Sequence, residues 1–445
     1  MTDKIQLSDH FTYKRLIRFV IPSVVMMIFT SVYSVVDGLF VSNFAGKTPF
    51  AAINLIMPLL IILGAVGFMI GAGGTAIVAK TLGLGDKKLA NEYFSFLIYA
   101  TLVLGTLLSL LGIIFAEPVS RLLGAEGEML DYCVTYARII LLALPFFMLQ
   151  NIFQSFFITA EKPKLGLLVT VAAGVTNILL DALFVAVLEL GLVGAAAATA
   201  ISQLIGGVVP LIYFSLNNSS TLRLGRTGLY FGVLFRTCIN GSSELMSNIS
   251  ASVVTILYNY QLMRFAGEDG VAAYGAIMYV AFIFVAIFIG FVIGAGPIVS
   301  FHFGAGNTDE LRSIYKKSLT VVGAVGVAMT ATALILSVPL THLFVGYDSV
   351  LYEITLRGFI IYAFSYLLSG FNIFGSAFFT SLNNGVVSAV ISFLRTLVFQ
   401  CATVMLLPIW LELDGVWLSV IAAELLSVTV TFIFLIINKK KYSYA

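Results

Sequence analysis

Four polar residues of this sequence fall inside long apolar segments. Asp37 stands in "SVYSVVDGLFVSNFAG", within a run that is otherwise apolar from about residue 16 to residue 41. Asn177 and Asp181 stand in "TNILLD", and Thr199 follows in the next apolar segment. A charged side chain at membrane depth is costly and marks a functional site by default. Carboxylate, amide and hydroxyl oxygens can bind a proton or a hard cation, so these residues are candidates for cation chemistry.

The spacing of these residues predicts a single pocket. Asn177 and Asp181 are four positions apart, so on a helix they share a face. Asp37 and Asp181 lie late in their segments and Thr199 lies early in the next one, at a matching depth. Two neighbouring carboxylates in a low dielectric cannot both stay ionised cheaply, so we expect them to share a proton or a Na⁺ ion. The alternative is that backbone or hydroxyl groups satisfy each acid separately.

Three further ionisable residues lie deep in apolar segments. Glu244, in "NGSSELMSNIS", is a candidate for contact with a substrate or cation, although the nearby serines and Asn248 could simply solvate it. Arg395 and Glu424 are opposite in charge, and a buried structural pair is the expected explanation.

Composition defines the class of protein. The chain has 445 residues, of which 60% are hydrophobic and 10% charged, and its mean hydropathy is +1.04. A soluble domain carries roughly a quarter charged residues, so we expect an all-α integral membrane protein. Apolar windows of about 20 residues predict twelve transmembrane helices near 16–41, 51–74, 93–115, 133–158, 165–187, 192–215, 233–260, 271–298, 316–338, 355–380, 386–408 and 416–437. The first window lacks a cleavage site and is expected to be retained.

Basic residues predict the orientation of these spans. Most of the 24 lysines and arginines flank the spans on the side that carries both termini, among them Lys87, Lys88, Arg223 and Lys440. By the positive-inside rule, both termini are expected in the cytoplasm. The three cysteines and three histidines have no disulfide or metal-ligand spacing, so neither a disulfide framework nor a zinc site is predicted.

The chain contains an internal repeat at a fixed offset. "NIFQSFFIT" at 151–159 recurs as "NIFGSAFFT" at 372–380, 221 positions later, and the same offset maps Gly83 onto Gly304. We therefore expect two six-helix bundles, an N-lobe of residues 1–220 with helices 1–6 and a C-lobe of residues 221–445 with helices 7–12. Because both halves start from the same side, their pseudo-two-fold axis should run along the membrane normal.

The polar cluster is confined to the first half. The offset maps Asp37, Asn177, Asp181 and Thr199 onto residues of a different character, namely Tyr258, Val398, Ala402 and Val420. Residues that served only to pack the repeat would occur in both halves, so this asymmetry favours a function. Tyr258 is in turn a candidate for contact with a substrate or cation in the C-lobe.

With these features the sequence resembles the multidrug and toxic compound extrusion (MATE) family, and within it the bacterial multidrug-efflux branch. The resemblance covers essentially the whole chain and rests on the twelve spans, the duplication, "VVDGLFVSNFAG", the glycine-rich stretches "GFMIGAGG" and "GFVIGAG", and the N-lobe polar residues. It implies an exporter driven by inward H⁺ or Na⁺. Family members place the coupling site, with Na⁺ as one ion it could hold, on positions matching Asp37, Asn177, Asp181 and Thr199. Pro22 matches a family proline implicated in helix bending.

Some family members instead use a cation site in the C-lobe. That site combines a glutamate matching Glu244 with an aspartate in the tenth helix. In this chain the span 355–380 contains no acid, so the expectation falls on the N-lobe.

We therefore expect a secondary active efflux antiporter for drugs or organic cations in the bacterial inner membrane, and not an enzyme. It should need no cofactor beyond the coupling ion, bind no nucleic acid and work as a monomer. The nearest alternative is a flippase for lipid-linked precursors, which should line its cavity with more cations than this chain offers. An intramembrane protease using Asp37 and Asp181 lacks the expected Gly-x-Gly-Asp motif, and a receptor or scaffold leaves the buried acids unexplained.

Overall fold

A computed structural model describes residues 5–445, apart from the side chains of Asn43, Ala45 and Lys47. The described residues contain helices and no strand. The first half forms α1 (Tyr13–Phe40), the π-helical turn η1 (Val41–Ala45), α2 (Lys47–Gly83), α3 (Lys87–Leu122), α4 (Gly127–Thr159), α5 (Pro163–Asp181), the π-helical turn η2 (Ala182–Val187) and α6 (Gly191–Ser215). The second half forms α7 (Phe231–Gly304), α8 (Thr308–Val345), α9 (Ser349–Ala363), α10 (Tyr366–Ser381), α11 (Gly385–Phe393), the π-helical turn η3 (Leu394–Phe399), α12 (Gln400–Leu406) and α13 (Pro408–Tyr442).

These helices make the twelve spans that hydropathy predicts. The run α7 has 74 residues, but at Gly267 its backbone leaves the helical region, with φ 60° and ψ −148°, so it supplies two spans. Helices α9 and α10 are bent by 49° and together form one broken span. The turn η2 continues α5, and η3 and α12 continue α11. The expected all-α membrane fold is confirmed.

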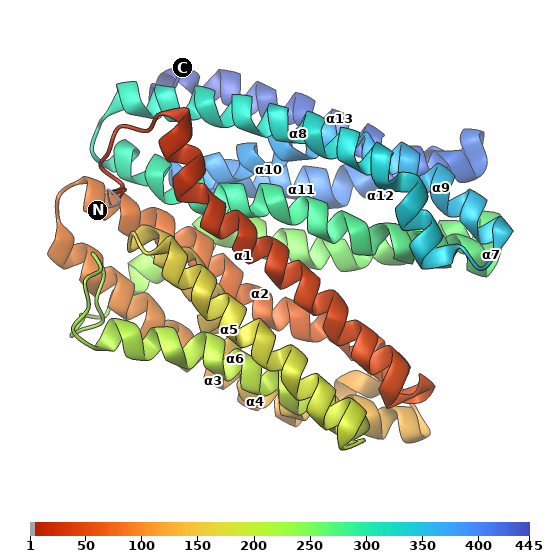
Figure 1. The fold of residues 1–445 in the computed structure, drawn as a ribbon. Helices are drawn as coiled ribbons and strands as arrows, with labels where there is room; N and C mark the ends of the chain where they lie inside the picture. The colour runs from red at the N-terminus through yellow and green to blue at the C-terminus, as the bar shows by residue number, and fades with distance from the viewer. Residues whose placement is uncertain (1–4) are drawn as a thin grey trace.

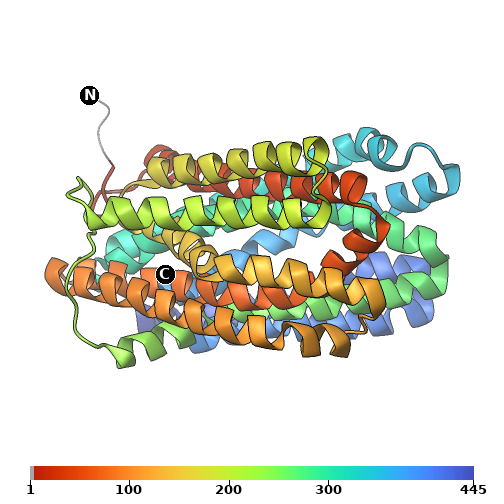
Figure 2. The same ribbon diagram turned by 90° about the horizontal axis from the view of Figure 1, so that it is seen from below.

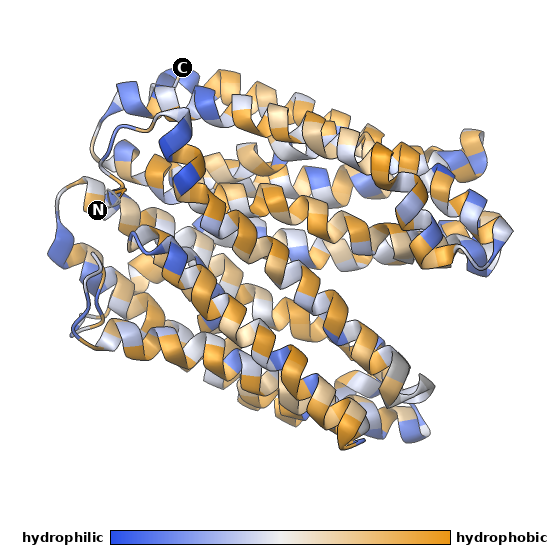
Figure 3. Ribbon diagram, in the orientation of Figure 1, coloured by the Kyte–Doolittle hydropathy of each residue, from blue (hydrophilic) through white to orange (hydrophobic). Residues whose placement is uncertain are grey.

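The helices gather in two bundles that meet at one end of the molecule. In Figure 1, α3–α6 lie in the lower bundle and α8–α13 in the upper one, while α1 starts beside α8 and descends to the end of α5. The first described residues and the C-terminus lie where the bundles meet, here called the terminal end, and the bundles diverge toward the opposite, far end. Figure 2 shows the connecting loops confined to the two ends. Apolar residues cover the helices between these ends, as expected for a membrane protein (Figure 3).

Glycines allow backbone contact between the two bundles at the terminal end. A Cβ at Gly83 of α2 would lie 2.1 Å from the carbonyl oxygen of Phe301 in α7, and a Cβ at Gly304 would lie 2.1 Å from that of Lys80. The repeat offset maps Lys80 onto Phe301 and Gly83 onto Gly304. The two contacts are therefore reciprocal, as an interface on a two-fold axis requires.

The glycine-rich stretches of α2 and α7 also serve helix packing. A Cβ at Gly241 would lie 1.8 Å from the carbonyl oxygen of Met69, and a Cβ at Gly290 would lie 2.5 Å from the Cα of Val24. Small residues of this kind let membrane helices cross with their backbones in contact. These crossings fix the bundles against each other in the terminal half of the molecule.

Buried aromatic residues fill the bundles and the terminal end. The rings of Phe94 and Phe156 pack 4.9 Å apart in the first bundle, and Trp417 is buried in the second. A further cluster at the terminal end buries Phe11 and Tyr444, so both ends of the described chain are packed into the core. Aromatic pairs of this kind add to the stability that area burial alone provides.

Candidate cation-binding site

A glycine brings together the two helices that carry the N-lobe acids. A Cβ at Gly174 of α5 would lie 2.5 Å from the ring of Phe29 and 2.8 Å from that of Tyr33, both on α1. Phe29, Tyr33 and Asp37 follow at steps of four residues and share one face of α1. The close approach therefore turns the Asp37 side of α1 toward the end of α5 that carries Asp181.

The four polar residues of the predicted pocket lie together. The side chains of Asp181, Asn177 and Thr199 all lie within hydrogen-bonding reach of the Asp37 carboxylate. Asn177 is 1% exposed and Asp181 is 0% exposed, whereas Asp37 and Thr199 are partly buried. The spacing of these residues in the sequence thus predicts which side chains are neighbours, and their role stays a prediction.

The polar atoms of this cluster are not satisfied by the protein. Six atoms, namely Asp37 Oδ1, Asn177 Nδ2 and Oδ1, Asp181 Oδ1 and Oδ2, and Thr199 Oγ1, are buried and have no hydrogen bond of regular length and angle with any described group. An unpaired buried polar atom costs about 1–3 kcal/mol. Buried polar groups are normally paired, so such a concentration in one place fits a site that binds a proton, a cation or water.

Two tyrosines and a glutamine extend the cluster. Tyr136 of α4 is 2% exposed and interacts electrostatically with both Asp37 and Asp181. Tyr33 interacts with Asp37 and with Gln150 of α4. Tyr33 could have been found in the sequence because it precedes Asp37 by one helical turn. No sequence signal points to Tyr136, because a contact across helices leaves no trace in local spacing.

A small cavity adjoins the cluster. It has a volume of about 80 Å³ and is lined by Thr199 and Gln203 of α6, Tyr136 and Ile140 of α4, and Met57 of α2, among others. A volume of this size can hold several water molecules. The cavity next to the cluster is therefore mostly apolar, and Thr199, Gln203 and Tyr136 supply its polar groups.

The backbone is π-helical next to each buried charge cluster. The turn η1 begins four residues after Asp37, and η2 begins directly after Asp181. Arg395 lies inside the third turn, η3. The π-helix is rare and occurs mostly as single turns, frequently at functional sites, so the local winding agrees with a special role for these positions.

Glu244 lies apart from the N-lobe cluster. It lines a cavity of about 50 Å³ between the bundles, together with Thr75 of α2, Ser155 of α4, and Ser300 and Thr380 of the second half. The hydroxyl groups around this cavity come from other segments and not from the serines next to Glu244 in the sequence, and the role of Glu244 stays a prediction.

Arg395 and Glu424 form a buried ion pair. Arg395 Nη2 lies 2.7 Å from Glu424 Oε1, and Arg395 Nε lies 3.1 Å from both carboxylate oxygens. Asn372 of α10 donates to Glu424 Oε2 at 2.5 Å, and Thr431 donates to Asn372 at 3.0 Å. The expected structural pair is confirmed, and its carboxylate is saturated by protein groups.

The other two predicted residues are both buried. Tyr258 is 3% exposed, and its hydroxyl lies 2.7 Å from Ser419 Oγ, so it packs in the core of the second half, and its contact with a substrate or cation stays a prediction. Pro22 stands inside α1, which is helical on both sides of it, and lines a cavity at the terminal end. Helix bending at Pro22 stays a prediction.

Comparison with known proteins places the chain in a family. A model of the MatE family matches residues 22–183 and 245–405, one stretch in each half. The chain belongs to the MatE family. Multidrug export protein MepA of Staphylococcus saprophyticus is 26% identical over 318 residues, which cover 71% of this MatE chain and 70% of MepA. MepA of Staphylococcus aureus is 24% identical over 317 residues, which cover 70% of this chain and 69% of MepA.

Solved structures share the fold of this MatE protein. A MATE crystallised in complex with MaL6 has a TM-score of 0.94 at 21% identity and covers 100% of both chains. An outward-facing multidrug resistance MATE family transporter of the MOP superfamily has a TM-score of 0.93 at 21% identity, with the same coverage. The resemblance found in the sequence is confirmed, and the protein is a multi-pass membrane transporter of the MatE family.

Proposed function

We propose that this MatE protein is a secondary active antiporter that exports small-molecule drugs or organic cations. Inward movement of H⁺ or Na⁺ would drive the export. The names of its relatives, which are multidrug export proteins, support the substrate class. The observation that carries the coupling step is the group of six buried, unpaired polar atoms around Asp37 and Asp181. A bound proton or cation would satisfy these atoms.

The composition of the site suits either coupling ion. Two carboxylates, an amide oxygen and a hydroxyl are oxygen ligands of the type that hard cations prefer. The same two carboxylates can share a proton because neighbouring negative charges in a low dielectric resist joint ionisation. The ion is a transported substrate here, and no further cofactor is proposed.

The state of the C-lobe supports an N-lobe coupling site. The guanidinium of Arg395 already occupies the position that a coupling cation would need in order to neutralise Glu424. Asn372 donates a hydrogen bond to the other carboxylate oxygen. A buried carboxylate that is already paired gains little from a second cation. Asp181 has no such partner among the described groups.

Basic residues support an orientation in the bacterial plasma membrane with both termini in the cytoplasm. Exposed Lys87, Lys88, Arg223 and Lys440 gather at the terminal end. The far end, where the bundles diverge, would then face outward. The likeness to an outward-facing transporter supports this conformation.

Coupling follows from differential binding. An ion can drive export only if it binds the outward-facing and inward-facing states with different affinity, and the drug must favour the opposite change. Asp37 lies on α1, which packs against both α5 and the second bundle. Charge neutralisation at Asp37 would therefore act on a helix that touches both halves. The protein would do this as a monomer.

A flippase for lipid-linked precursors is the second candidate. Such a protein would line its central cavity with free cations for a pyrophosphate. In the described part of the chain, the deep arginine Arg395 is engaged by Glu424, which supports the exporter instead.

The decisive test uses purified protein in proteoliposomes, with a pH gradient and a Na⁺ gradient imposed separately. We expect uptake of a fluorescent organic cation driven by one of the two gradients. Transport that ignores both gradients would overturn the antiporter, and transport of a lipid-linked pyrophosphate in place of drugs would establish the flippase.

A further inference from the structure

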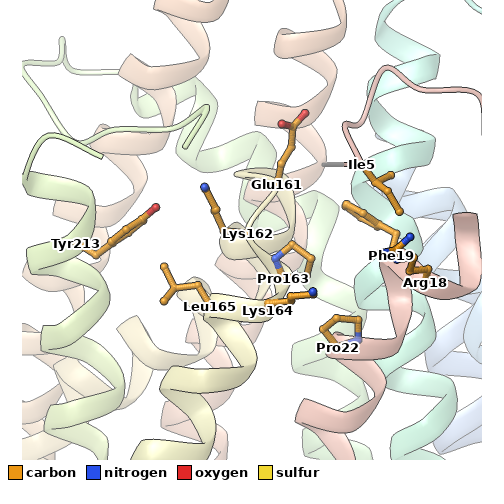
Figure 4. A pocket seen from close by; sticks show the side chains of 10 residues that line it. All are labelled: Ile5, Arg18, Phe19, Pro22, Glu161, Lys162, Pro163, Lys164, Leu165 and Tyr213. Atoms are coloured by element: carbon orange, nitrogen blue, oxygen red, sulfur yellow. The ribbon is translucent and has the colours of Figure 1, made fainter. Parts of the chain in front are cut away.

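A larger cavity than those beside the cation cluster and Glu244 lies at the terminal end. It has a volume of about 430 Å³ and lies between the second and third turns of α1 and the first turn of α5. Figure 4 shows Lys164 reaching from α5 toward the wall formed by α1, on which Arg18, Phe19 and Pro22 lie. Tyr213 of α6 stands on the opposite side. The proposed transport cycle assigns no role to this space.

Two cations face this cavity without a protein partner. Arg18 and Lys164 are exposed and form no ion pair or hydrogen bond with any described residue. The other charged residues at the rim are engaged, since Lys162 donates to Ser219 Oγ at 2.8 Å and Glu161 accepts from the backbone of Leu7 at 3.0 Å. Like charges around one cavity repel, so an anion between Arg18 and Lys164 would be favoured.

The cavity borders a surface suited to lipid chains. On α1, Ile17 is 43% exposed and Ile21 is 50% exposed, and on α5, Leu168 is 63% exposed. These apolar side chains lie within one or two turns of Arg18 and Lys164, on helices that span the membrane. A ligand at this position would meet cations at one end and an apolar surface at the other.

We propose that the cavity between α1 and α5, lined by Arg18, Lys164 and Pro22, binds the head group of an anionic phospholipid. A phosphate group would lie between the guanidinium and the ammonium, as in basic pockets between membrane helices at the cytoplasmic face. Its acyl chains would lie along Ile17, Ile21 and Leu168. We infer a lipid and not a soluble phosphate as the ligand, because an exposed apolar surface lies directly next to the two cations.

This site would connect lipid composition to transport. Pro22 lies on the cavity wall and belongs to the same helix as Asp37. A head group packed against Pro22 would contact α1 at a residue that cannot donate a backbone hydrogen bond, where the helix lacks one of its internal hydrogen bonds. The binding site itself does not depend on which ion or drug is transported, so it can fail independently of the proposed function.

The test measures lipid retention by the full-length protein. Detergent-purified wild type is titrated with phosphatidylglycerol, or with phosphatidylcholine of the same acyl chains, and bound lipid is counted by native mass spectrometry. We expect wild type to prefer phosphatidylglycerol. Arg18→Gln/Lys164→Gln should bind this lipid about thirtyfold more weakly, because the loss of each cation near an anionic head group lowers the affinity about fivefold.

A matched control removes the same charge elsewhere. Lys439→Gln/Lys440→Gln changes two exposed basic residues at the same end of the molecule that do not line the cavity, and should retain phosphatidylglycerol like wild type. If the double variant is poorly folded, Lys164→Gln alone serves, since Lys164 is exposed.

Three results would overturn the proposal. The first is equal retention of phosphatidylglycerol by wild type and Arg18→Gln/Lys164→Gln. The second is equal loss in the control variant, which would indicate a general charge effect. The third is displacement of bound lipid by millimolar inorganic phosphate, which would identify the site as one for soluble anions.

Discussion

The buried acids Glu424 and Asp181 lie in contrasting environments. The carboxylate of Glu424 is held by Arg395 and Asn372, whereas both carboxylate oxygens of Asp181 are buried with no described hydrogen-bond partner. Leaving such atoms unpaired costs about 1–3 kcal/mol each. A protein can tolerate this loss of stability at a site where a bound ligand pairs with the atoms during function. The presence or absence of protein partners therefore distinguishes a structural acid, such as Glu424, from a candidate coupling acid, such as Asp181.

Asp37→Asn should abolish efflux and leave expression and thermal stability close to wild type. The substitution keeps the shape of the side chain and removes a charge at membrane depth, so it relieves a cost rather than adding one. Drug resistance of cells that carry the variant, together with efflux in proteoliposomes, measures the effect. Wild-type resistance would exclude the N-lobe mechanism.

Glu244→Gln should impair transport less than Asp181→Asn. Glu244 lies among hydroxyl groups between the bundles, whereas Asp181 shares the cluster with Asp37. Both substitutions are isosteric, so each serves as the control for the other in the same efflux assay. An inactive Glu244→Gln beside an active Asp181→Asn would move the coupling site to the C-lobe.

Arg395→Met should lower the free energy of unfolding by about 3–5 kcal/mol, because it leaves the buried Glu424 charge without its partner. Arg395→Met/Glu424→Leu should recover most of that loss, since replacing both members of a buried pair by apolar residues is often neutral. Thermal unfolding in detergent measures both variants. If the double variant is no more stable than Arg395→Met, the hydrogen bonds and packing of Arg395 and Glu424 contribute to stability beyond the pairing of their charges.

At the scale of elements, helix crossings depend on glycine. The α2–α7 crossing sets a Cβ at Gly241 only 1.8 Å from the carbonyl oxygen of Met69. Neither atom is at the end of a flexible side chain, so a methyl group can be accommodated only if the two backbones separate. The same geometry at Gly83 and Gly304 shows that the closed end of the molecule is held by close backbone packing.

Gly241→Ala should therefore lower the free energy of unfolding by about 1–3 kcal/mol, the usual range for overpacking. Gly275→Ala is the matched control, because Gly275 lies in the same run α7 and a Cβ there would meet nothing within 4 Å. The midpoint of thermal unfolding in detergent compares them. Equal midpoints for the two variants would show that α2 and α7 can separate without cost.

At the scale of the whole molecule, residues 5–12 join the two bundles across the terminal end. Leu7 donates its backbone N–H to Glu161 in the first bundle at 3.0 Å, and Phe11 donates to Glu310 of α8 at 2.8 Å. His10 Nδ1 lies 2.5 Å from the same Glu310 carboxylate. The segment thus holds the two bundles together at the terminal end, the end that would open in the inward-facing state under the proposed orientation.

Glu310→Ala should release this segment and favour opening at the terminal end. The reporter is a cysteine at Ser300, which lines the small cavity beside Glu244, in a background with Cys133, Cys238 and Cys401 replaced by serine. Its labelling by a membrane-impermeant thiol reagent should become several-fold faster. Asp309→Ala, at an adjacent exposed residue of α8, should leave the rate unchanged, and equal rates in both variants would exclude a closing role for the segment.

Much of this architecture is determined by the sequence alone. Hydropathy specifies the spans because the lipid core requires about 20 apolar residues per helix. The constant offset identifies the repeat, and the four-residue spacing of Asn177 and Asp181 places them on one helical face. Matching depth then groups Asp37 and Thr199 with them. Each of these signals is local or one-dimensional, so each can be read before any helix is packed.

Only the tertiary structure decides how those faces meet. Helical periodicity does not specify the rotation or crossing angle of two helices distant in sequence. For that reason the sequence does not reveal that Tyr136 faces the carboxylates, or that Phe11 is buried beside α8. The reciprocal backbone contacts at Gly83 and Gly304 likewise depend on packing between segments 221 residues apart. These contacts between distant helices are determined by close packing, which depends on the complementary shapes of the helices along their whole interface.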